Sequence, residues 1–185
     1  MIARAAWGYV PAMGAIQQAN DPAARRYEFH RRVARGVTGS IIAEIARQGL
    51  MPQQARTCQL LGIEDQAILA AGNWIFPWRR IMGQTRPYYR RFELALWHGG
   101  NLYGLAVGRA SRGPDNVTIH FLERAGGNNP FAGYFAQIAL DAADRYAKLI
   151  GRQRVKLKNP ASGLIPTWDF RLQIRYLGIL IMRDR

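Results

Sequence analysis

A stretch rich in glycine and asparagine precedes the clearest helical pattern of the chain. It reads Gly-Gly-Asn-Asn-Pro-Phe-Ala-Gly-Tyr over residues 126–134. Backbone N–H groups in such a loop, and in the first turn of the helix that follows, can bind an anion, and the helix dipole favours negative charge there. A pyrophosphate suits this arrangement, although a glycine-rich loop before a helix is also common as a plain turn.

Three side chains near this loop could carry a proton. Glu123 ends a predicted strand and could act as a general base, directly or through water, or it could be a surface carboxylate paired with an arginine. His120 lies three residues earlier, so strict alternation along a strand places it on the opposite face and predicts no dyad with Glu123. Tyr134 is an alternative acid if its hydroxyl points into a cleft.

Residues 72–91 interleave aromatic and basic side chains, and their prolines and glycines exclude a long regular element. Such a pattern suits base stacking and phosphate contacts, or the anchoring of an irregular segment on the core. We expect the anchoring role for Trp74 and Trp78. The arginines remain a candidate nucleic-acid or partner patch, which consists of Arg79, Arg80, Arg86, Arg90 and Arg91.

The charge balance favours a polyanionic partner. The 185 residues include 26 basic and 12 acidic ones, giving a net charge of +14, and this field attracts nucleic acid, anionic membrane or a phosphate-rich cofactor. A basic protein without a nucleic-acid role is an equally open interpretation. Cys58 is the only cysteine, which excludes an internal disulfide and fits a reducing, cytoplasmic compartment. One cysteine and three widely spaced histidines give no zinc pattern, and Cys58 on an apolar stretch is expected in the core.

The elements that must position these residues follow from periodicity and turn signals. Helical patterns cover about 22–48, 52–61, 64–71 and 135–149, with Gly36 and Gly39 as candidate breaks in the first. Strands are predicted at 92–97, 102–109, 117–123, 154–159 and 172–182, with a hairpin turn at 99–101 and a short helix near 164–170. Val117, Ile119 and Phe121 are expected on one face of their strand. The prediction is an α/β fold, a mixed, mostly antiparallel sheet flanked by helices.

This order of elements resembles the GNAT superfamily of acyl-CoA-dependent N-acetyltransferases, in a divergent bacterial or prophage-type form. The resembling segments are FELALWHGGNLYGLAVGRAS, VTIHFLERA, NPFAGYFAQIALDAADRYAKLIG and RVKLKNPASGLIPTWDFRLQI. They cover about residues 90–182. The resemblance implies one GNAT-like domain over 1–185, with a helical N-terminal region (1–71), an aromatic and arginine-rich connector (72–91) and an acyl-CoA-binding core (92–185).

The resemblance also implies a cofactor, acetyl-CoA, held between the third strand and its neighbour. The backbone of Phe121, Leu122, Glu123 and Arg124 would pair with the pantetheine, and that of Ala132, Gly133, Tyr134 and Phe135 would hold the pyrophosphate. Asn159 matches a position near the pantetheine in many relatives. Pro130 and Phe135 depart from the usual loop motif, and Trp168 stands near the point where many relatives have a tyrosine acid. Trp168 cannot protonate a thiolate usefully.

The resemblance therefore implies transfer of an acetyl group to an amine of unknown identity, on a protein or on a carrier such as tRNA. The alternative is a catalytically inactive GNAT-like module that binds nucleic acid or a protein partner. A third reading is an interaction protein that works through its N-terminal helices. An exposed sheet edge could pair with a second copy to form a homodimer. No metal site is expected. No membrane span is expected either, since no run of about 18 apolar residues occurs.

Overall fold

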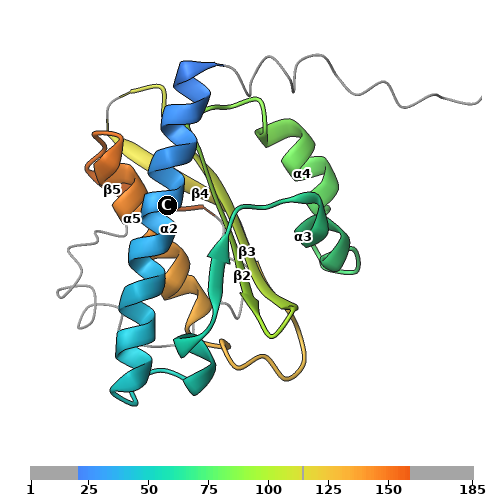
Figure 1. Ribbon diagram of the computed structural model, residues 1–185. Helices are drawn as coiled ribbons and strands as arrows, with labels where there is room; N and C mark the ends of the chain where they lie inside the picture. Colours follow the sequence, from blue (N-terminus) through green and yellow to red (C-terminus); the bar gives the residue numbers. More distant parts are fainter. Residues whose placement is uncertain (1–20, 114, 159–185) are drawn as a thin grey trace, which may run out of the picture.

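A computed structural model describes residues 21–113 and 115–158 of the chain. The described chain forms three layers, a central sheet with helices on both faces (Figure 1). Its elements, in order, are α2 (Pro22–Arg47), the 3-10 helix η1 (Gln53–Arg56), β1 (Gln59–Leu61), α3 (Asp65–Ala70), α4 (Trp78–Thr85), β2 (Arg91–His98), β3 (Asn101–Ala110), β4 (Asn116–Arg124), α5 (Phe135–Leu149) and β5 (Arg154–Leu157).

The sheet has five strands in the order β1-β2-β3-β4-β5. The first three pairings are antiparallel and the last, β4 with β5, is parallel. This confirms the predicted mixed, mostly antiparallel sheet flanked by helices. Gly99 and Gly100 have φ angles of 56° and 78°, so the hairpin between β2 and β3 uses the left-handed conformations that glycine adopts without strain.

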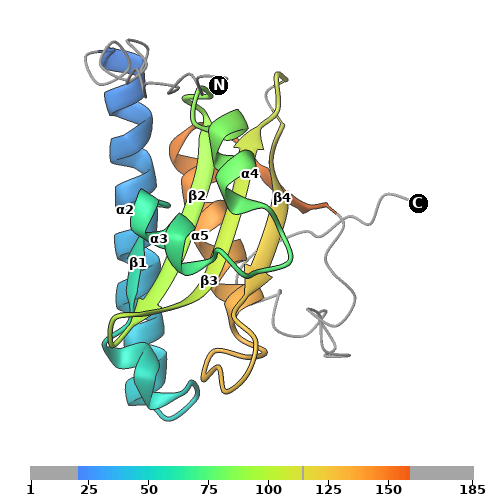
Figure 2. The same cartoon turned by 90° about the vertical axis from the view of Figure 1, so that its right-hand side faces the viewer.

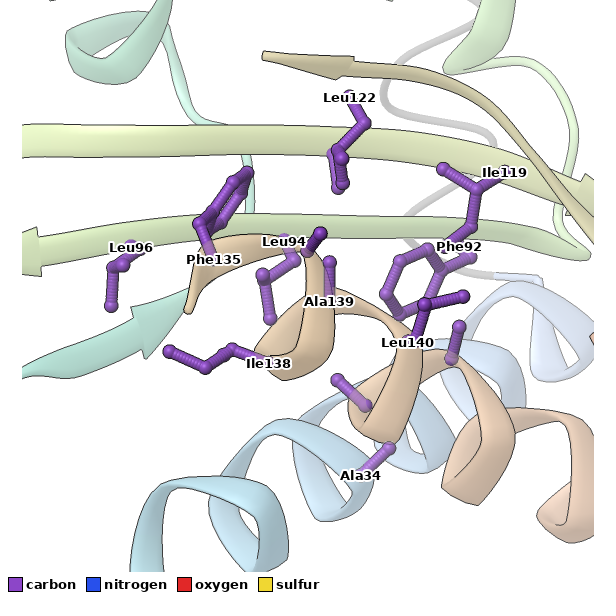
Figure 3. Packing of buried hydrophobic residues seen from close by; sticks show 14 of the residues in the cluster. Ala34, Phe92, Leu94, Leu96, Ile119, Leu122, Phe135, Ile138, Ala139 and Leu140 are labelled. Atoms are coloured by element: carbon purple, nitrogen blue, oxygen red, sulfur yellow. The ribbon is translucent and has the colours of Figure 1, made fainter. Parts of the chain in front are cut away.

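Two apolar clusters fix the helices to the sheet. On one face, α2 and α5 pack on Phe92, Leu94 and Leu96 of β2 (Figure 3). On the other face, α3 and α4 cover Ala95 and Trp97 of the same strand (Figure 2). Side chains therefore alternate between two buried faces, which explains why β2 is buried along its whole interior.

Helix α2 runs unbroken through Gly36 and Gly39, so neither glycine acts as the predicted break. The Asp21 carboxylate caps its start by accepting a hydrogen bond from the Ala23 N–H at 2.7 Å. On the sheet side, buried Arg31 and Arg35 donate to the carbonyl oxygens of β2 and of the residues just before it. Arg31 Nη1 lies 2.8 Å from the Tyr89 oxygen and 3.2 Å from the Arg91 oxygen, and Arg35 Nη1 lies 3.3 Å from the Glu93 oxygen.

These arginines cover a stretch of sheet edge that β1 leaves open. β1 pairs only with residues 95–97 of β2, so the carbonyls before residue 95 lack a strand partner on that side among the described residues. Unpaired edge carbonyls template association with other chains, and a helix that supplies donors to them removes this hazard. The hydrogen bonds from Arg31 and Arg35 also fix α2 against the sheet. Within β2, the buried Glu93 carboxylate forms an ion pair with Arg91, whose Nε lies 2.7 Å from Oε2.

The N-terminal half differs from the sequence prediction at one element. Residues 52–61, predicted as a helix, form η1 and then strand β1, because Gln59, Leu60 and Leu61 pair with β2 and Leu60 packs on the core. Residues 1–71 are therefore not only a helical region, and the sheet does not begin at residue 92. Between residues 72 and 91 the one regular element is the eight-residue helix α4, which agrees with the exclusion of a long element there.

Strand β4 contains an irregularity that overturns a second expectation. Phe121 pairs with Val107 and Ile119 with Gly108, which leaves His120 as an extra residue in a β-bulge. Val117 and Ile119 consequently lie in the cluster beneath α5, whereas Phe121 packs against the opposite cluster. The expectation that all three share one face was wrong. Alternation from Thr118 now places His120 on the same face as Glu123, not on the opposite one.

No helix in the described part of the chain is long and apolar enough to cross a membrane. Residues 1–20, the predicted short helix near 164–170 and the predicted last strand at 172–182 lie outside the described residues.

Candidate functional site

The parallel pairing of β4 and β5 stops partway along β4. It joins residues 116–119 to 154–157, and the Lys158 N–H donates to the Ile119 oxygen at 2.9 Å as the last contact. Beyond the bulge at His120, residues 121–124 pair with β3 on one side and have no strand partner on the other among the described residues. Among the described residues, the backbone groups on that side have no strand to pair with.

The loop after β4 is held in shape by the side chain of Asn129, which is 6% exposed. Its Nδ2 donates to the carbonyl oxygens of Tyr103 and Ala125 at 3.0 and 3.1 Å, and its Oδ1 accepts from the Phe131 N–H at 2.9 Å. One asparagine thus uses both ends of its amide to tie the loop to β3. The buried ring of Phe131 anchors the turn that leads into α5.

Helix α5 begins without a side-chain cap, so its first N–H groups are the relevant donors. Three of the four amides expected to hold a pyrophosphate already donate within the loop: Ala132 to the Asn129 oxygen, and Tyr134 and Phe135 to the Phe131 oxygen. Within the described residues, the N–H groups of Gly133 and Ala136 have no hydrogen-bond partner. Among the described residues, the donors left for an anion are therefore Gly133, which belongs to the predicted set, and Ala136, which does not.

The start of α5 also lies close to the sheet. A Cβ on Gly104 of β3 would come within 2.5 Å of the Phe135 ring, so the buried Phe135 side chain rests directly on the glycine backbone. The Tyr134 side chain is half-buried and packs on the edge of the same cluster. Gly133, with a φ of 86°, is exposed and makes the turn into the helix.

Glu123 is not the surface carboxylate paired with an arginine that the sequence allowed. It is buried, at 6% exposure, and pairs with no arginine among the described residues. Its Oε1 accepts from the Ile75 N–H at 2.6 Å, and its Oε2 accepts from the Phe76 N–H at 3.1 Å and the Trp78 indole N–H at 2.8 Å. Three donors occupy the carboxylate, which favours a structural role, anchoring residues 75–78, over that of a general base.

The other predicted cofactor residues of β4 divide by face. The Phe121 ring contacts that of Phe76, with centroids 5.4 Å apart, and Leu122 is buried beneath α5. Arg124 is half-buried and donates to the Ala125 oxygen at 3.4 Å. Only backbone groups and Arg124 thus remain for a ligand at this strand. Asn159 and Trp168 lie outside the described residues.

The five arginines predicted as a patch from residues 72–91 lie in different surroundings. Arg86 pairs with Asp65 at 2.7 Å, and Arg91 pairs with the buried Glu93. Arg79 and Arg80 are exposed on α4, and Arg90 lines a separate groove near the start of α2. Trp78 is buried and Trp74 packs against the same cluster, which confirms their anchoring role.

No group of three potential metal ligands occurs in the part of the chain that the structure describes. Cys58 is half-buried and its Sγ contacts the Ala55 oxygen at 3.5 Å, in agreement with the expected place against the core. Burial raises the pKa of this thiol to about 11, so it is not a ready nucleophile at neutral pH.

The sequence matches no known protein-family model. No curated protein matches it either. Among solved structures, the chain is similar to a transcriptional regulator from Bacillus halodurans C-125, with 13% sequence identity and a TM-score of 0.46, over 69% of this chain and 96% of that one. A similarity this low transfers neither a family nor a function.

Sequence reasoning missed two features that could carry function. The free amide of Ala136 could not be found, because which loop N–H groups are occupied depends on the path of the backbone. The groove that contains Arg90 was missed because its arginines come from the separate segments 22–27, 87–90 and 109–120. The sequence signals of it were the net charge and the tyrosines and Arg90 at the end of residues 72–91.

Proposed function

We propose that this protein is an acetyl-CoA-dependent N-acetyltransferase whose cofactor enters where β4 and β5 stop pairing. The observation that carries the proposal is the end of the parallel ladder at Ile119 and Leu157. The loop after β4 adds the amides of Gly133 and Ala136, which have no hydrogen-bond partner among the described residues. The pantetheine amides would pair with the backbone of residues 121–124. The diphosphate would accept hydrogen bonds from Gly133 and Ala136 at the positive end of α5.

The chemistry would be direct acyl transfer. The nitrogen lone pair of a neutral amine attacks the thioester carbonyl carbon, and the C–S bond then breaks to release the coenzyme A thiolate. The amine loses one proton and the thiolate gains one, so the products are an amide and free coenzyme A. Backbone N–H groups of β4 would polarise the carbonyl oxygen. Tyr134 stays the predicted proton donor, whereas the occupied carboxylate of Glu123 leaves deprotonation to solvent or to the acceptor's own surroundings.

Two ligands of different length test the cofactor site. Acetyl-CoA should raise the melting temperature, because a ligand that binds only the folded state stabilises it. S-acetylpantetheine, which lacks the diphosphate, should bind at least about tenfold more weakly if the α5 amides contribute. Equal binding of both ligands would remove the diphosphate site, and no shift at millimolar acetyl-CoA would remove the proposal.

A pair of glycine variants makes the test specific to the loop. Gly133→Ala and Gly49→Ala each place a side chain in open space at a positive φ, 86° and 77°, so both carry similar backbone strain. Only Gly133→Ala should weaken acetyl-CoA binding, since Gly49 lies beyond the end of α2. Equal binding of acetyl-CoA to both variants would contradict the assignment of the Gly133 amide.

The alternative is a coenzyme-binding or partner-binding module without catalysis. The occupied carboxylate of Glu123 favours it, because the one strand carboxylate at the site is committed to Trp78 and its neighbours. Isotope-labelled acetyl-CoA incubated with polyamines, lysine-rich protein or aminoacyl-tRNA distinguishes the two functions: label in none of these acceptors, with tight acetyl-CoA binding retained, supports the module.

A further inference from the structure

A groove of about 910 Å³ opens at the end of the sheet that lies beside the start of α2, away from the loop before α5. It is bounded by the first turns of α2, the segment before β2, the turn between β3 and β4, and the first half of β4. Its lining residues with polar or aromatic side chains are Arg26, Tyr27, Tyr88, Tyr89, Arg90, Arg109, Ser111, Arg112, Thr118 and His120.

The charge in this groove has one sign. Arg26, Arg90, Arg109 and Arg112 are all exposed, and none of them has an ion-pair partner among the described residues. No carboxylate lines the groove. Asp21, at the start of α2, is engaged by the Tyr89 hydroxyl and the Ala23 N–H, which together lower the pKa of that carboxyl.

Several arginines outside the groove, in contrast, are paired with carboxylates. Arg31 and Arg35 pair with Glu28, Arg86 with Asp65, and Arg91 with Glu93. Their guanidinium groups are therefore occupied by carboxylates of the fold. Four arginines gathered without acids must repel one another, so the folded state carries an electrostatic cost that a bound anion would relieve.

Flat rings are interleaved with the cations. The guanidinium carbon of Arg109 lies 4.9 Å from the centroid of the Tyr88 ring, and that of Arg26 lies 5.5 Å from the Tyr27 ring. Tyr88 is 49% exposed, so it presents stackable surface to solvent. Arginine planes and tyrosine rings together form the stacking platforms used by proteins that hold unpaired bases.

We infer that this groove binds single-stranded nucleic acid, with phosphates on the four arginines and bases stacked on Tyr88 and its neighbours. A simple phosphate site would need the cations and not the exposed ring. An anionic membrane would need large apolar side chains for insertion, and no large aliphatic side chain lines the groove. The inference does not depend on acetyl transfer, because the arginines and rings lie apart from the loop before α5.

Binding is measured by fluorescence anisotropy with a labelled single-stranded RNA of about 12 nucleotides, in the absence of acetyl-CoA. For four phosphate contacts, the slope of log affinity against log salt should be about −2.8, at about −0.7 per phosphate. A hairpin duplex of the same sequence should bind less tightly, since its bases are already stacked. Binding of inorganic polyphosphate or of phosphatidylserine vesicles as tight as that of the RNA would overturn the inference.

Two matched variants locate the site. Arg26, Arg90, Arg109 and Arg112 changed together to Gln should lower RNA affinity at least about 30-fold and flatten the salt slope toward zero. The control changes Arg47, Arg56, Arg79 and Arg80 to Gln, which removes the same charge elsewhere on the surface and should leave affinity within about threefold. All eight residues are exposed, so neither variant should melt below the wild type, and the loss of mutual repulsion should leave the groove variant at least as stable as the wild type. Equal losses in the two variants would overturn the groove assignment.

A single ring substitution tests the stacking contact. Tyr88→Ser should weaken RNA binding by about fivefold or more, whereas Tyr88→Phe keeps the ring and should bind as the wild type does. Polyphosphate binding should be the same in both variants. RNA affinity unchanged by Tyr88→Ser would remove the nucleic-acid interpretation and leave a phosphate site.

Discussion

The indole N–H of Trp78 donates a 2.8 Å hydrogen bond to Oε2 of Glu123, which joins helix α4, on one face of the sheet, to the end of strand β4. The N–H groups of Ile75 and Phe76 fill the remaining positions on this carboxylate. A buried charge that receives three hydrogen bonds is stabilised in place. The bond therefore decides both how residues 75–78 pack and why Glu123 is a poor candidate for a base.

We expect Glu123→Ala to lower the free energy of unfolding by about 2–3 kcal/mol, because it leaves the Trp78 indole and two backbone donors without an acceptor. Glu123→Gln, which keeps one acceptor oxygen, should cost about 1 kcal/mol. Urea unfolding followed by tryptophan fluorescence measures both values. If Glu123→Gln were fully stable but lost all acetyl transfer, the structural interpretation of Glu123 would be wrong.

The contact between Gly104 and Phe135 predicts a compensating pair. Gly104→Ala should destabilise the fold by about 1–3 kcal/mol, since its Cβ would lie 2.5 Å from the Phe135 ring. Adding Phe135→Leu to Gly104→Ala should recover part of that loss, and a double-mutant cycle of unfolding free energies measures the coupling. Strict additivity would contradict the contact.

Gly108→Ala provides a contrast to this pair. Its Cβ would lie 2.2 Å from the backbone oxygen of Thr118, next to the bulge at His120. No side-chain truncation can relieve that clash, so we expect a loss larger than that of Gly104→Ala and no rescue by Phe135→Leu. Thermal unfolding of the four variants separates the cases.

His120 predicts a pH-dependent part of the stability. Burial, and then the charges of Arg109 and Lys158, lowers the pKa of His120 below its ordinary value of 6.5. The unfolded state therefore binds a proton at His120 more readily than the folded state does. The part of the unfolding free energy that depends on neutral His120 is fully present above pH 6.5 and is lost as the pH falls through the pKa of His120 in the folded protein. Unfolding free energies measured between about pH 7.5 and 5 should decline less in His120→Asn than in the wild type. Parallel pH profiles would reject the prediction.

Cys58 should react slowly in the folded protein. Its pKa of about 11, compared with an ordinary value of 9.0, lowers the thiolate fraction at neutral pH roughly 100-fold. Iodoacetamide labelling followed by mass spectrometry should therefore be at least about 100-fold slower than in urea. A labelling rate equal to that in urea would show that the thiol is not held against the core.

Much of the fold could be predicted from local patterns in the sequence. Alternation over 92–97 and 102–109, the Gly99-Gly100 turn and the apolar stripe of 135–149 each depend on neighbours in the chain, and the structure has these elements where the patterns place them. The same reasoning failed at 52–61, because a three-residue strand is stabilised by its pairing with β2 rather than by its own periodicity. It failed again at Phe121, because one extra residue in β4 reverses the faces that follow.

The sequence by itself determined the sheet-and-helix class, the excess of arginine and the place of a glycine-rich loop before α5, since composition and short-range periodicity are properties of the chain alone. Only the tertiary structure decided which of those groups are free. Glu123 lies 45 to 48 residues from its donors, and the groove arginines come from three separate segments. Occupancy of a carboxylate or an amide, and the gathering of like charges, are set by distances through space that no spacing along the chain records.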